Sequence, residues 1–359
     1  MRKPIPANPQ RVLLVNTTKY LGNLLLAGGL MQAFVAHCQS RGATCHILLD
    51  ESFRGLCDKA FAPGTLLWFP RRAIARAGFL EKMSLYAQCL RQVRNLQADL
   101  AFNIEDDPAA SHLTRLSGAA FKLGCSPARH QHGYHQVLAV DFENREPSRA
   151  HRWDSYFEVF AALGMPETPR GYLQLAPPPM AQPLEDRLRT IGWDPRLPTV
   201  ALHAGATKEY KKWPSAHMAA LIELCLAAGL QPVLLGAGNS DLADNAVIRD
   251  KVNAPGVIDL CNQLSLPELA QFLGRCKAMV GNDSGPFHLG SALGVPGLVL
   301  WGPTNSAIWG PLGKNSTIVT GTFTCDPACN KGFCQHEHRC LAEITPQHVF
   351  GLLRTRISR

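Results

Sequence analysis

An acid, a histidine and a run of small residues lie close together in residues 281–304, which read GNDSGPFHLGSALGVPGLVLWGPT. Ser284 is suited to cap a short helix that ends near Gly294, and the amino terminus of a helix presents unpaired N–H groups with a partial positive charge. The stretch therefore predicts an anion site, most simply for a phosphate or diphosphate. Asp283 and His288 would then meet the uncharged part of the ligand, such as sugar hydroxyls. The alternative, in which Asp283 caps the helix and His288 is a core histidine, stays open at this point.

A second polar stretch, HAGATKEYKKWP at residues 203–214, follows another apolar run. Thr207 offers a hydroxyl and Lys211 a cation, and both suit the phosphates that the first stretch could bind. A plainer interpretation is a solvated lysine pair before a packed helix start. Both stretches follow predicted strands, and ligands in open α/β folds bind where the carboxyl ends of parallel strands meet. We therefore expect the two stretches to form one site.

Strands and helices alternate along the chain, which predicts an α/β fold with parallel sheets and right-handed crossovers. The predicted strands are 11–15, 45–50, 65–69, 99–105 and 121–124 in the first half and 199–205, 232–238, 257–260, an apolar run ending at 277–281 and 297–301 in the second, with helices at 24–38, 80–96 and 215–228. The proline-rich segment between residues 166 and 198 is typical of a linker. The predicted domains are residues 1–176 and 177–359, and 359 residues is an ordinary length for two domains.

The composition is that of a soluble globular protein, with 46% hydrophobic and 18% charged residues. We expect no apolar run long enough to span a membrane. The polar residues at 16–19 interrupt the apolar run near the start, which argues against a signal peptide. These features predict a cytoplasmic protein.

The formal net charge of +8 favours an acidic partner. Nucleic acid is not predicted, because basic and aromatic residues do not interleave. The densest basic cluster, Arg71, Arg72 and Arg76, is either a solvated helix face or a docking site for an acidic acceptor. Two glycine-rich segments are not nucleotide loops: GAGNSD has Asp241 where a third glycine is needed, and GPLGKNS lacks a Ser or Thr directly after Lys314.

Several motifs resemble glycosyltransferase family 9, the bacterial heptosyltransferases. They are YLGNLLLAGGL (20–30), HRWDSYFEVFAALG (151–164), KKWP (211–214), PVLLGAG (232–238), NDSGPFHLGSALGVP (282–296) and WGPT (301–304), in family order over nearly the whole chain. The resemblance implies a GT-B architecture: two Rossmann-like parallel-sheet domains facing a cleft, with the acceptor on the N-terminal domain and the sugar nucleotide on the C-terminal one. It also implies inverting transfer of heptose from ADP-heptose to an acidic lipopolysaccharide core acceptor, with no cofactor required for catalysis.

The resemblance assigns the donor site by position. Lys211 and the backbone at Ser284 and Gly285 would hold the diphosphate. Asp283 and His288 would hold the heptose. The edge of the donor pocket would be formed by the threonine of the WGPT motif, Thr304.

Two positions depart from the family pattern. The acidic residue expected on the ribose is shifted to Asp241, which leaves the preference for ADP open. Asn23 stands where the family has an aspartate proposed as general base, and an amide cannot usefully accept the proton. The base lies elsewhere, the reaction runs more slowly without it, or the protein is a sugar-nucleotide-binding pseudoenzyme. Glu105, Asp106 and Asp107 lie at the carboxyl end of a predicted strand, and we expect one of them to substitute, with Asp106 preferred; a solvated turn capping the next helix is the alternative.

Four of the twelve cysteines cluster in CDPACNKGFCQHEHRC at residues 325–340. Cys325, Cys329, Cys334 and Cys340 could hold a structural Zn or Fe ion, or they could be reduced thiols without a metal. The other eight are predicted core residues. The resemblance implies that similar clusters recur in the family and that some protein-heptosylating relatives hold iron through cysteines. An autotransporter-type protein heptosyltransferase is therefore a second interpretation. The expected partners are a sugar nucleotide, an acidic glycolipid and, transiently, the inner face of the inner membrane.

Overall fold

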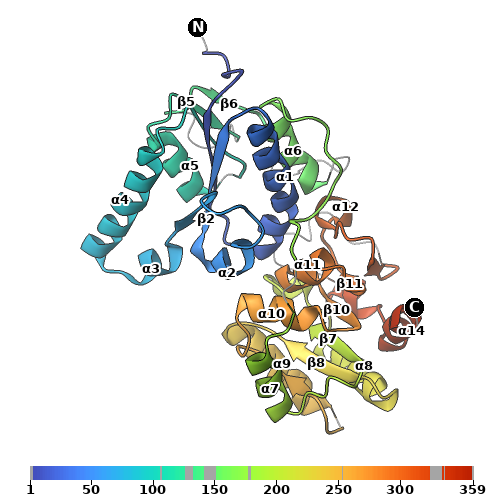
Figure 1. Cartoon of the computed structure of the whole chain (residues 1–359). Helices are drawn as coiled ribbons and strands as arrows, with labels where there is room; N and C mark the ends of the chain where they lie inside the picture. The colour runs from blue at the N-terminus through green and yellow to red at the C-terminus, as the bar shows by residue number, and fades with distance from the viewer. Residues whose placement is uncertain are drawn as a thin grey trace. The chain divides into compact units, whose positions relative to one another are not determined.

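The computed structural model divides the chain into two compact units, Met1–Leu175 and Ala176–Arg359 (Figure 1). The structure describes residues 3–105, 107–125, 132–140, 151–176, 179–252, 254–323, 334 and 336–357. The division falls one residue before the boundary that the sequence predicts. The two parts are called the N-terminal unit and the C-terminal unit below.

The N-terminal unit is built on a parallel sheet with the strand order β3-β2-β1-β4-β5-β6. Its strands are β1 (Arg11–Asn16), β2 (Thr44–Asp50), β3 (Leu66–Phe69), β4 (Leu100–Asn103), β5 (Phe121–Gly124) and β6 (Gln136–Val137). Its helices are α1 (Leu21–Ser40), α2 (Arg54–Cys57), α3 (Arg71–Arg76), α4 (Phe79–Asn95), α5 (Pro108–Leu116) and α6 (Arg152–Ala161), with a 3₁₀ turn at Glu51–Phe53. In Figure 1, α1 and α6 cover one face of the sheet and α4 and α5 the other.

Both faces of this sheet are packed with apolar side chains. On one face, Val15 of β1 belongs to a buried cluster with Val93 of α4. On the other, Phe34 of α1, Phe102 of β4 and Phe160 of α6 form an aromatic group with ring centroids 5.1 to 5.8 Å apart. Strands buried on both faces are almost entirely apolar, which is why β1 and β4 show no polar alternation.

Helix α1 begins at Leu21, three residues earlier than predicted, so Asn23 lies in its first turn. Among the described residues, it is the one helix long and apolar enough to cross a membrane by length and composition, which corrects the expectation of no such run. More than half of it is buried inside the unit. A Cβ on Gly28 would lie 2.4 Å from the Cβ of Leu173, and the Leu173 N–H donates to the carbonyl of Leu25 at 2.9 Å. These contacts are those of a core helix.

The C-terminal unit has a second parallel sheet, in the order β12-β11-β10-β7-β8-β9. Its strands are β7 (Thr199–His203), β8 (Gln231–Leu235), β9 (Ile258–Asp259), β10 (Ala278–Asn282), β11 (Gly297–Trp301) and β12 (Ser316–Thr320). Its helices are α7 (Gln182–Thr190), α8 (Ser215–Ala227), α9 (Asn239–Lys251), α10 (Leu266–Leu273), α11 (Gly285–Ala292), α12 (Ser306–Trp309), α13 (Arg339–Ala342) and α14 (Pro346–Ile357). Helix α7 lies within the segment predicted as a linker, so that segment is helical in part, and the division between the two units also falls in it.

The two sheets repeat one topology. In each, the first strand lies between the second and the fourth, so the direction in which strands are added reverses between β1 and β4 and again between β7 and β10. Loops leaving the carboxyl ends of two such strands diverge to opposite faces of the sheet and open a crevice, where open α/β folds bind ligands. The topology therefore predicts one functional crevice on each unit.

Candidate functional site

The loops after β7 and β10 are joined by one buried side chain. His203 and Gly281 pair across the two strands. Asn282, which is fully buried, donates its amide N–H to the carbonyl of Ala204 at 2.6 Å and accepts the backbone N–H of Trp213 at 3.1 Å. Because this amide bonds both ends of the 203–214 loop, it fixes that loop against the strand that carries Asp283.

Asp283 is the centre of a polar cluster drawn from three loops. The Lys211 ammonium donates to its Oδ2 at 2.6 Å, and the Thr304 hydroxyl lies 3.4 Å from the same oxygen. On the other side, Nε2 of His288 lies 3.8 Å from Oδ1. The structure thus brings together four predicted site residues: Lys211, Asp283, His288 and Thr304.

Asp283 is held as a carboxylate in spite of its burial. Burial alone would raise its pKa, but the hydrogen bond with His288 and the positive charge of Lys211 outweigh it and leave the pKa below its usual range. Lys211 has three N–H donors, and the bond to Asp283 uses one of them. The same ammonium can therefore bind the carboxylate and an anionic ligand together.

A second chain of polar contacts runs through a histidine that the sequence analysis did not single out. His203, the last residue of β7, lies with Nδ1 3.0 Å from the Ser284 hydroxyl and with Nε2 3.4 Å from Oδ2 of Asp241. The Ser284 side chain makes no capping bond to α11, which corrects the prediction that it caps this helix. The first N–H groups of α11, beginning at Gly285, are therefore left without a side-chain cap.

Asp241 is folded inward against two glycines. A Cβ on Gly205 would lie 2.2 Å from Oδ1 of Asp241, and a Cβ on Gly236 would lie 2.7 Å from its Cβ. Its Oδ2 also accepts the N–H of Ala237 at 2.9 Å. Burial raises the pKa of this carboxyl, but bonds from His203 and from that N–H more than offset it, so the pKa is lowered.

Thr207, the remaining donor-loop prediction, is exposed. Among the described residues, no hydrogen bond joins its side chain to the Asp283 cluster or to the chain through His203. Its predicted role therefore rests on its place in the loop alone.

The crevice between β1 and β4 holds a buried carboxyl next to Asn23. Glu105 lies beyond β4 and accepts a hydrogen bond from the Tyr156 hydroxyl at 2.5 Å. The side chains of Thr18 and Asn23 also hydrogen bond to it. Burial raises its pKa, although these bonds and the charge of Arg152 act in the opposite direction.

Asp107 and Arg71 are occupied by structural contacts. The Asp107 carboxylate accepts the Thr17 hydroxyl at 2.5 Å and caps α5 through the Ala110 N–H at 3.1 Å. Arg71 lies 2.5 Å from Asp50 and 3.4 Å from Asp107, so it is not part of a solvated basic face. The turn after β4 does cap the next helix, through Asp107. Asp106, the preferred substitute base, lies outside the described residues.

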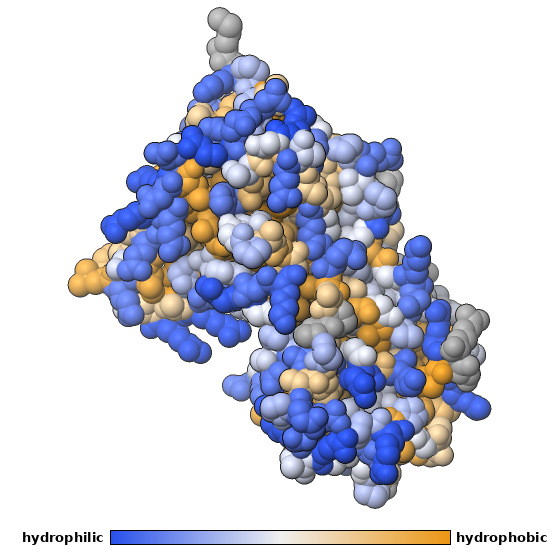
Figure 2. All heavy atoms as spheres, in the orientation of Figure 1, coloured by the Kyte–Doolittle hydropathy of each residue, from blue (hydrophilic) through white to orange (hydrophobic). Residues whose placement is uncertain are grey.

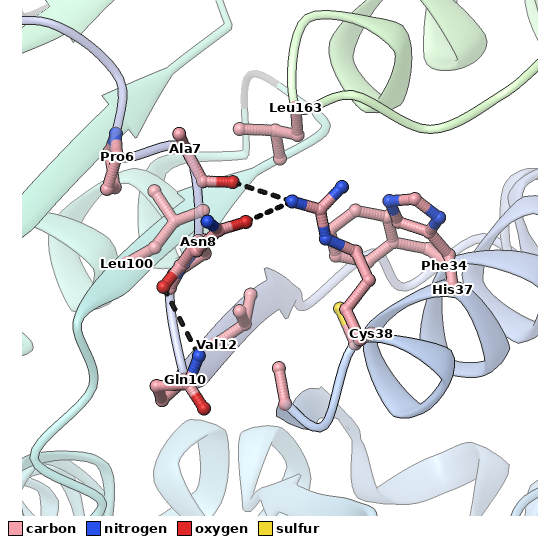
Figure 3. A pocket seen from close by; sticks show the side chains of 13 residues that line it. Pro6, Ala7, Asn8, Gln10, Val12, Phe34, His37, Cys38, Leu100 and Leu163 are labelled. Carbon is pink, nitrogen blue, oxygen red and sulfur yellow. Dashed lines mark hydrogen bonds between the residues drawn. The ribbon is translucent and has the colours of Figure 1, made fainter.

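A small cavity in the N-terminal unit lies at the amino ends of the strands, opposite the carboxyl ends that form the crevice (Figure 3). Its volume is about 30 Å³, and its lining includes residues 6–10, Val12 and Leu100 at the amino ends of the strands. Arg41 closes one side by donating to a backbone carbonyl of the 6–10 segment at 3.0 Å. This volume is enough for a water molecule. It is too small for a nucleotide.

Comparison with known proteins agrees with the fold. The profile of glycosyltransferase family 9 (heptosyltransferase) matches residues 86–338. The chain belongs to glycosyltransferase family 9. It is 30% identical to lipopolysaccharide heptosyltransferase 2 of Salmonella typhimurium over 151 residues, which are 41% of this chain and 43% of that protein. The match thus spans less than half of that curated relative.

Two solved structures share the whole fold of this family 9 chain. One is a glycosyl transferase family 9 protein from Veillonella parvula, with a TM-score of 0.77, 19% identity and 99% of both chains covered. The other is the ADP-heptose lps heptosyltransferase II of E. coli, with a TM-score of 0.73, 18% identity, and coverage of 97% of this chain and 98% of that one. The two six-stranded parallel sheets are those of the GT-B class.

The cysteine segment of this family 9 member is described only in part. Cys325 and Cys329 lie outside the described residues. Cys334 is partly exposed and accepts the N–H of His338 at 3.2 Å, whereas Cys340 is buried in the core of the C-terminal unit. Within the described part of the chain, no group of three or more His, Cys, Asp or Glu side chains could hold a metal ion. The metal site therefore stays a prediction.

The sequence analysis missed His203, Asn282 and Tyr156 as parts of the two crevices. His203 and Asn282 each end a buried strand, and a polar residue at the carboxyl end of a buried parallel strand is a signal for a site residue. Tyr156 gives no such signal, because it lies inside an amphipathic helix.

Proposed function

We propose that this protein transfers a heptose, with inversion, from ADP-heptose to an acidic lipopolysaccharide core acceptor. The observation that carries the proposal is the cluster of Lys211, Asp283, His288 and Thr304 beside the uncapped amino terminus of α11. A cation and exposed N–H groups suit a diphosphate, while a carboxylate and an imidazole suit sugar hydroxyls. The named activities of the relatives point to the same donor and acceptor classes.

The chemistry asks these residues to stabilise a leaving group. As the bond from the anomeric carbon to the diphosphate breaks, its electron pair stays with the departing ADP. The Lys211 ammonium and the backbone N–H groups of Ser284 and Gly285 would lie beside that growing charge, and fixed donors lower the barrier most where charge develops. Asp283 and His288 would keep the sugar in place during the displacement.

Asp241 and Thr207 complete the proposed donor site. Asp241 is the candidate for the ribose, and its bond to His203 ties it to Ser284 on the diphosphate side. Thr207 would add a hydroxyl from the exposed part of the loop. Neither residue calls for a metal ion, and a Zn or Fe ion at Cys325, Cys329, Cys334 and Cys340 would serve only to hold that segment.

The test is release of ADP from ADP-heptose by the purified protein, with and without heptose-deficient lipopolysaccharide. Lys211→Ala is expected to weaken ADP binding by about 10- to 100-fold, the usual cost of losing a charged hydrogen bond. Lys208→Ala is the matched control, because Lys208 is exposed in the same loop. Donor binding without any release, in the presence of acceptor, would make the protein a sugar-nucleotide binder and not a transferase.

A further inference from the structure

The crevice of the N-terminal unit contains a carboxyl that could replace the one missing at Asn23. Asn23 lies in the first turn of α1, and its side chain hydrogen bonds to Glu105, which follows β4. The two positions thus flank the same crevice from two elements. A carboxylate moved from α1 to the loop after β4 would still lie at the point where this sheet binds ligands.

The surroundings of Glu105 suit a proton acceptor more than a structural ion pair. The Tyr156 hydroxyl donates a hydrogen bond to Oε1 of Glu105 at 2.5 Å. The side chains of Thr18 and Asn23 hydrogen bond to the same carboxyl. The Arg152 guanidinium stacks on the Tyr156 ring, with 5.6 Å from its carbon to the ring centroid. Burial is the largest influence on the group and raises its pKa above the usual value of a glutamate, which makes the carboxylate a stronger base.

The neighbouring acids do not share these features. Asp107 is bound to Thr17, to Arg71 and to the amino terminus of α5, so a proton on it would disrupt three contacts. Asp50 is nine-tenths or more buried and is paired with Arg71. Among the described acids near the end of β4, Glu105 alone is bonded to Asn23.

We infer that Glu105 is the general base of this enzyme, in place of the aspartate that Asn23 replaces. This rests on the proposed transferase function. The acceptor hydroxyl oxygen forms the new bond to the anomeric carbon as the bond to the diphosphate breaks. The hydroxyl proton passes to the Glu105 carboxylate, and the electron pair of the broken bond leaves with the nucleoside diphosphate. Asn23 orients the carboxylate through its amide N–H.

The test compares the wild type, Glu105→Gln, Asn23→Asp and the double variant in acceptor-dependent ADP release. Glu105→Gln is expected to lower kcat by about 10²- to 10³-fold, in the range of general-base effects, while ADP affinity stays unchanged. Adding Asn23→Asp to Glu105→Gln should restore at least a tenth of the activity lost, because it returns the carboxylate to α1. The rise of wild-type kcat with pH should be absent from Glu105→Gln.

The failures are distinguishable. If the wild type transfers heptose and Glu105→Gln stays within about threefold of it, Glu105 is not the base and the proposed function stands. Suppose that Glu105→Gln is inactive, and that the double variant has the melting temperature of the wild type but is also inactive. The inference is then wrong as well. If the wild type binds donor but transfers nothing, the proposed function fails, and the inference fails with it.

A separate observation concerns the surface between α3 and α4. Phe79, Leu80 and Met83 begin α4 and are 77%, 82% and 57% exposed, although all three are large and apolar. Figure 2 shows hydrophobic atoms projecting at this corner of the N-terminal unit, with hydrophilic atoms around them. Three such side chains together are unusual on a surface that faces only water.

Exposed cations surround this apolar corner. Arg72 and Arg76 on α3 and Lys82 on α4 are exposed, against one exposed acid, Glu81. Apolar tips that enter the boundary of a bilayer, with Lys and Arg at the level of the headgroups, are the features by which proteins lie on anionic membranes. The local charge therefore complements a surface of anionic lipid.

We propose that the α3–α4 corner docks on an anionic lipid bilayer. The test is co-sedimentation of the purified protein with vesicles of phosphatidylcholine containing about one quarter phosphatidylglycerol. Phe79→Ser/Leu80→Ser/Met83→Ser should lower the bound fraction by about tenfold. Leu242→Ser/Val247→Ser, which changes two exposed apolar residues elsewhere, should leave it unchanged. Absence of wild-type binding, or equal loss in both variants, would overturn the proposal, as would a dimer that the triple variant abolishes.

Discussion

Lys211 and Asp283 are 72 residues apart in the chain and lie 2.6 Å apart in the fold. One follows β7 and the other follows β10, and the two strands are hydrogen-bonded neighbours. The parallel sheet thus turns two distant motifs into one charged pair. Because the carboxylate is buried, the pair couples the integrity of the site to pH.

The Asp283 carboxylate should make the free energy of unfolding decrease at acidic pH. The pKa of Asp283 is lower in the folded chain than in the unfolded one. Its contribution to the free energy of unfolding is therefore fully present above the unfolded-state pKa, and it is lost as the pH falls through the folded-state pKa. Urea unfolding at about pH 7 and about pH 3.5 should therefore show less acid sensitivity in Asp283→Asn than in the wild type. Equal acid sensitivity in the two proteins would contradict this.

Glu105 should have the opposite dependence. Burial raises the pKa of Glu105 in the folded chain. The free energy of unfolding therefore decreases as the pH rises from the unfolded-state pKa towards the folded-state pKa. Glu105→Gln, which keeps an acceptor for Tyr156, should gain stability relative to the wild type as pH rises from about 4.5 to about 8. Melting temperatures across this range measure it without any substrate. A difference that is constant with pH would show that burial does not perturb this carboxyl.

Gly205→Ala should destabilise the loop after β7 through a clash with Asp241, not through backbone strain. The new methyl group would lie 2.2 Å from the Asp241 carboxylate. We expect a loss of about 1–3 kcal/mol in the free energy of unfolding, the usual cost of overpacking. Gly78→Ala is the control, because a Cβ there meets nothing within 4 Å. Combining Gly205→Ala with Asp241→Ala should recover most of the loss, and no recovery would mean that the clash lies elsewhere.

Arg71 and Arg72 are adjacent but should respond differently to substitution. Arg71 pairs with Asp50, whose side chain is 2% exposed, whereas Arg72 is exposed. Arg71→Ala leaves a buried charge without its cation, which typically costs about 3–5 kcal/mol. Arg72→Ala should stay within about 0.5 kcal/mol of the wild type. Chemical denaturation of the two variants compares them directly, and similar losses would mean that the Asp50 pair is not stabilising.

The sequence by itself determined the fold class and the gathering of the loops that carry Lys211, Asp283 and Thr304. Alternating strands and helices require parallel pairing, and parallel pairing puts every strand's carboxyl end at one edge. Lys211, Asp283 and Thr304 each lie a few residues past a recognisable strand, so their meeting could be predicted without knowing any side-chain contact.

Only the tertiary structure decided which side chains bond to which. By local rules Ser284 could cap α11, but its hydroxyl hydrogen bonds to His203, which is 81 residues away in the chain. Glu105 and Asp107 look alike in the sequence, yet one is buried under Tyr156 from α6 and the other is bound by Arg71 from α3. Local rules act over a few residues, whereas burial and hydrogen-bond partners are set by elements that meet only when the sheet and its helices pack together.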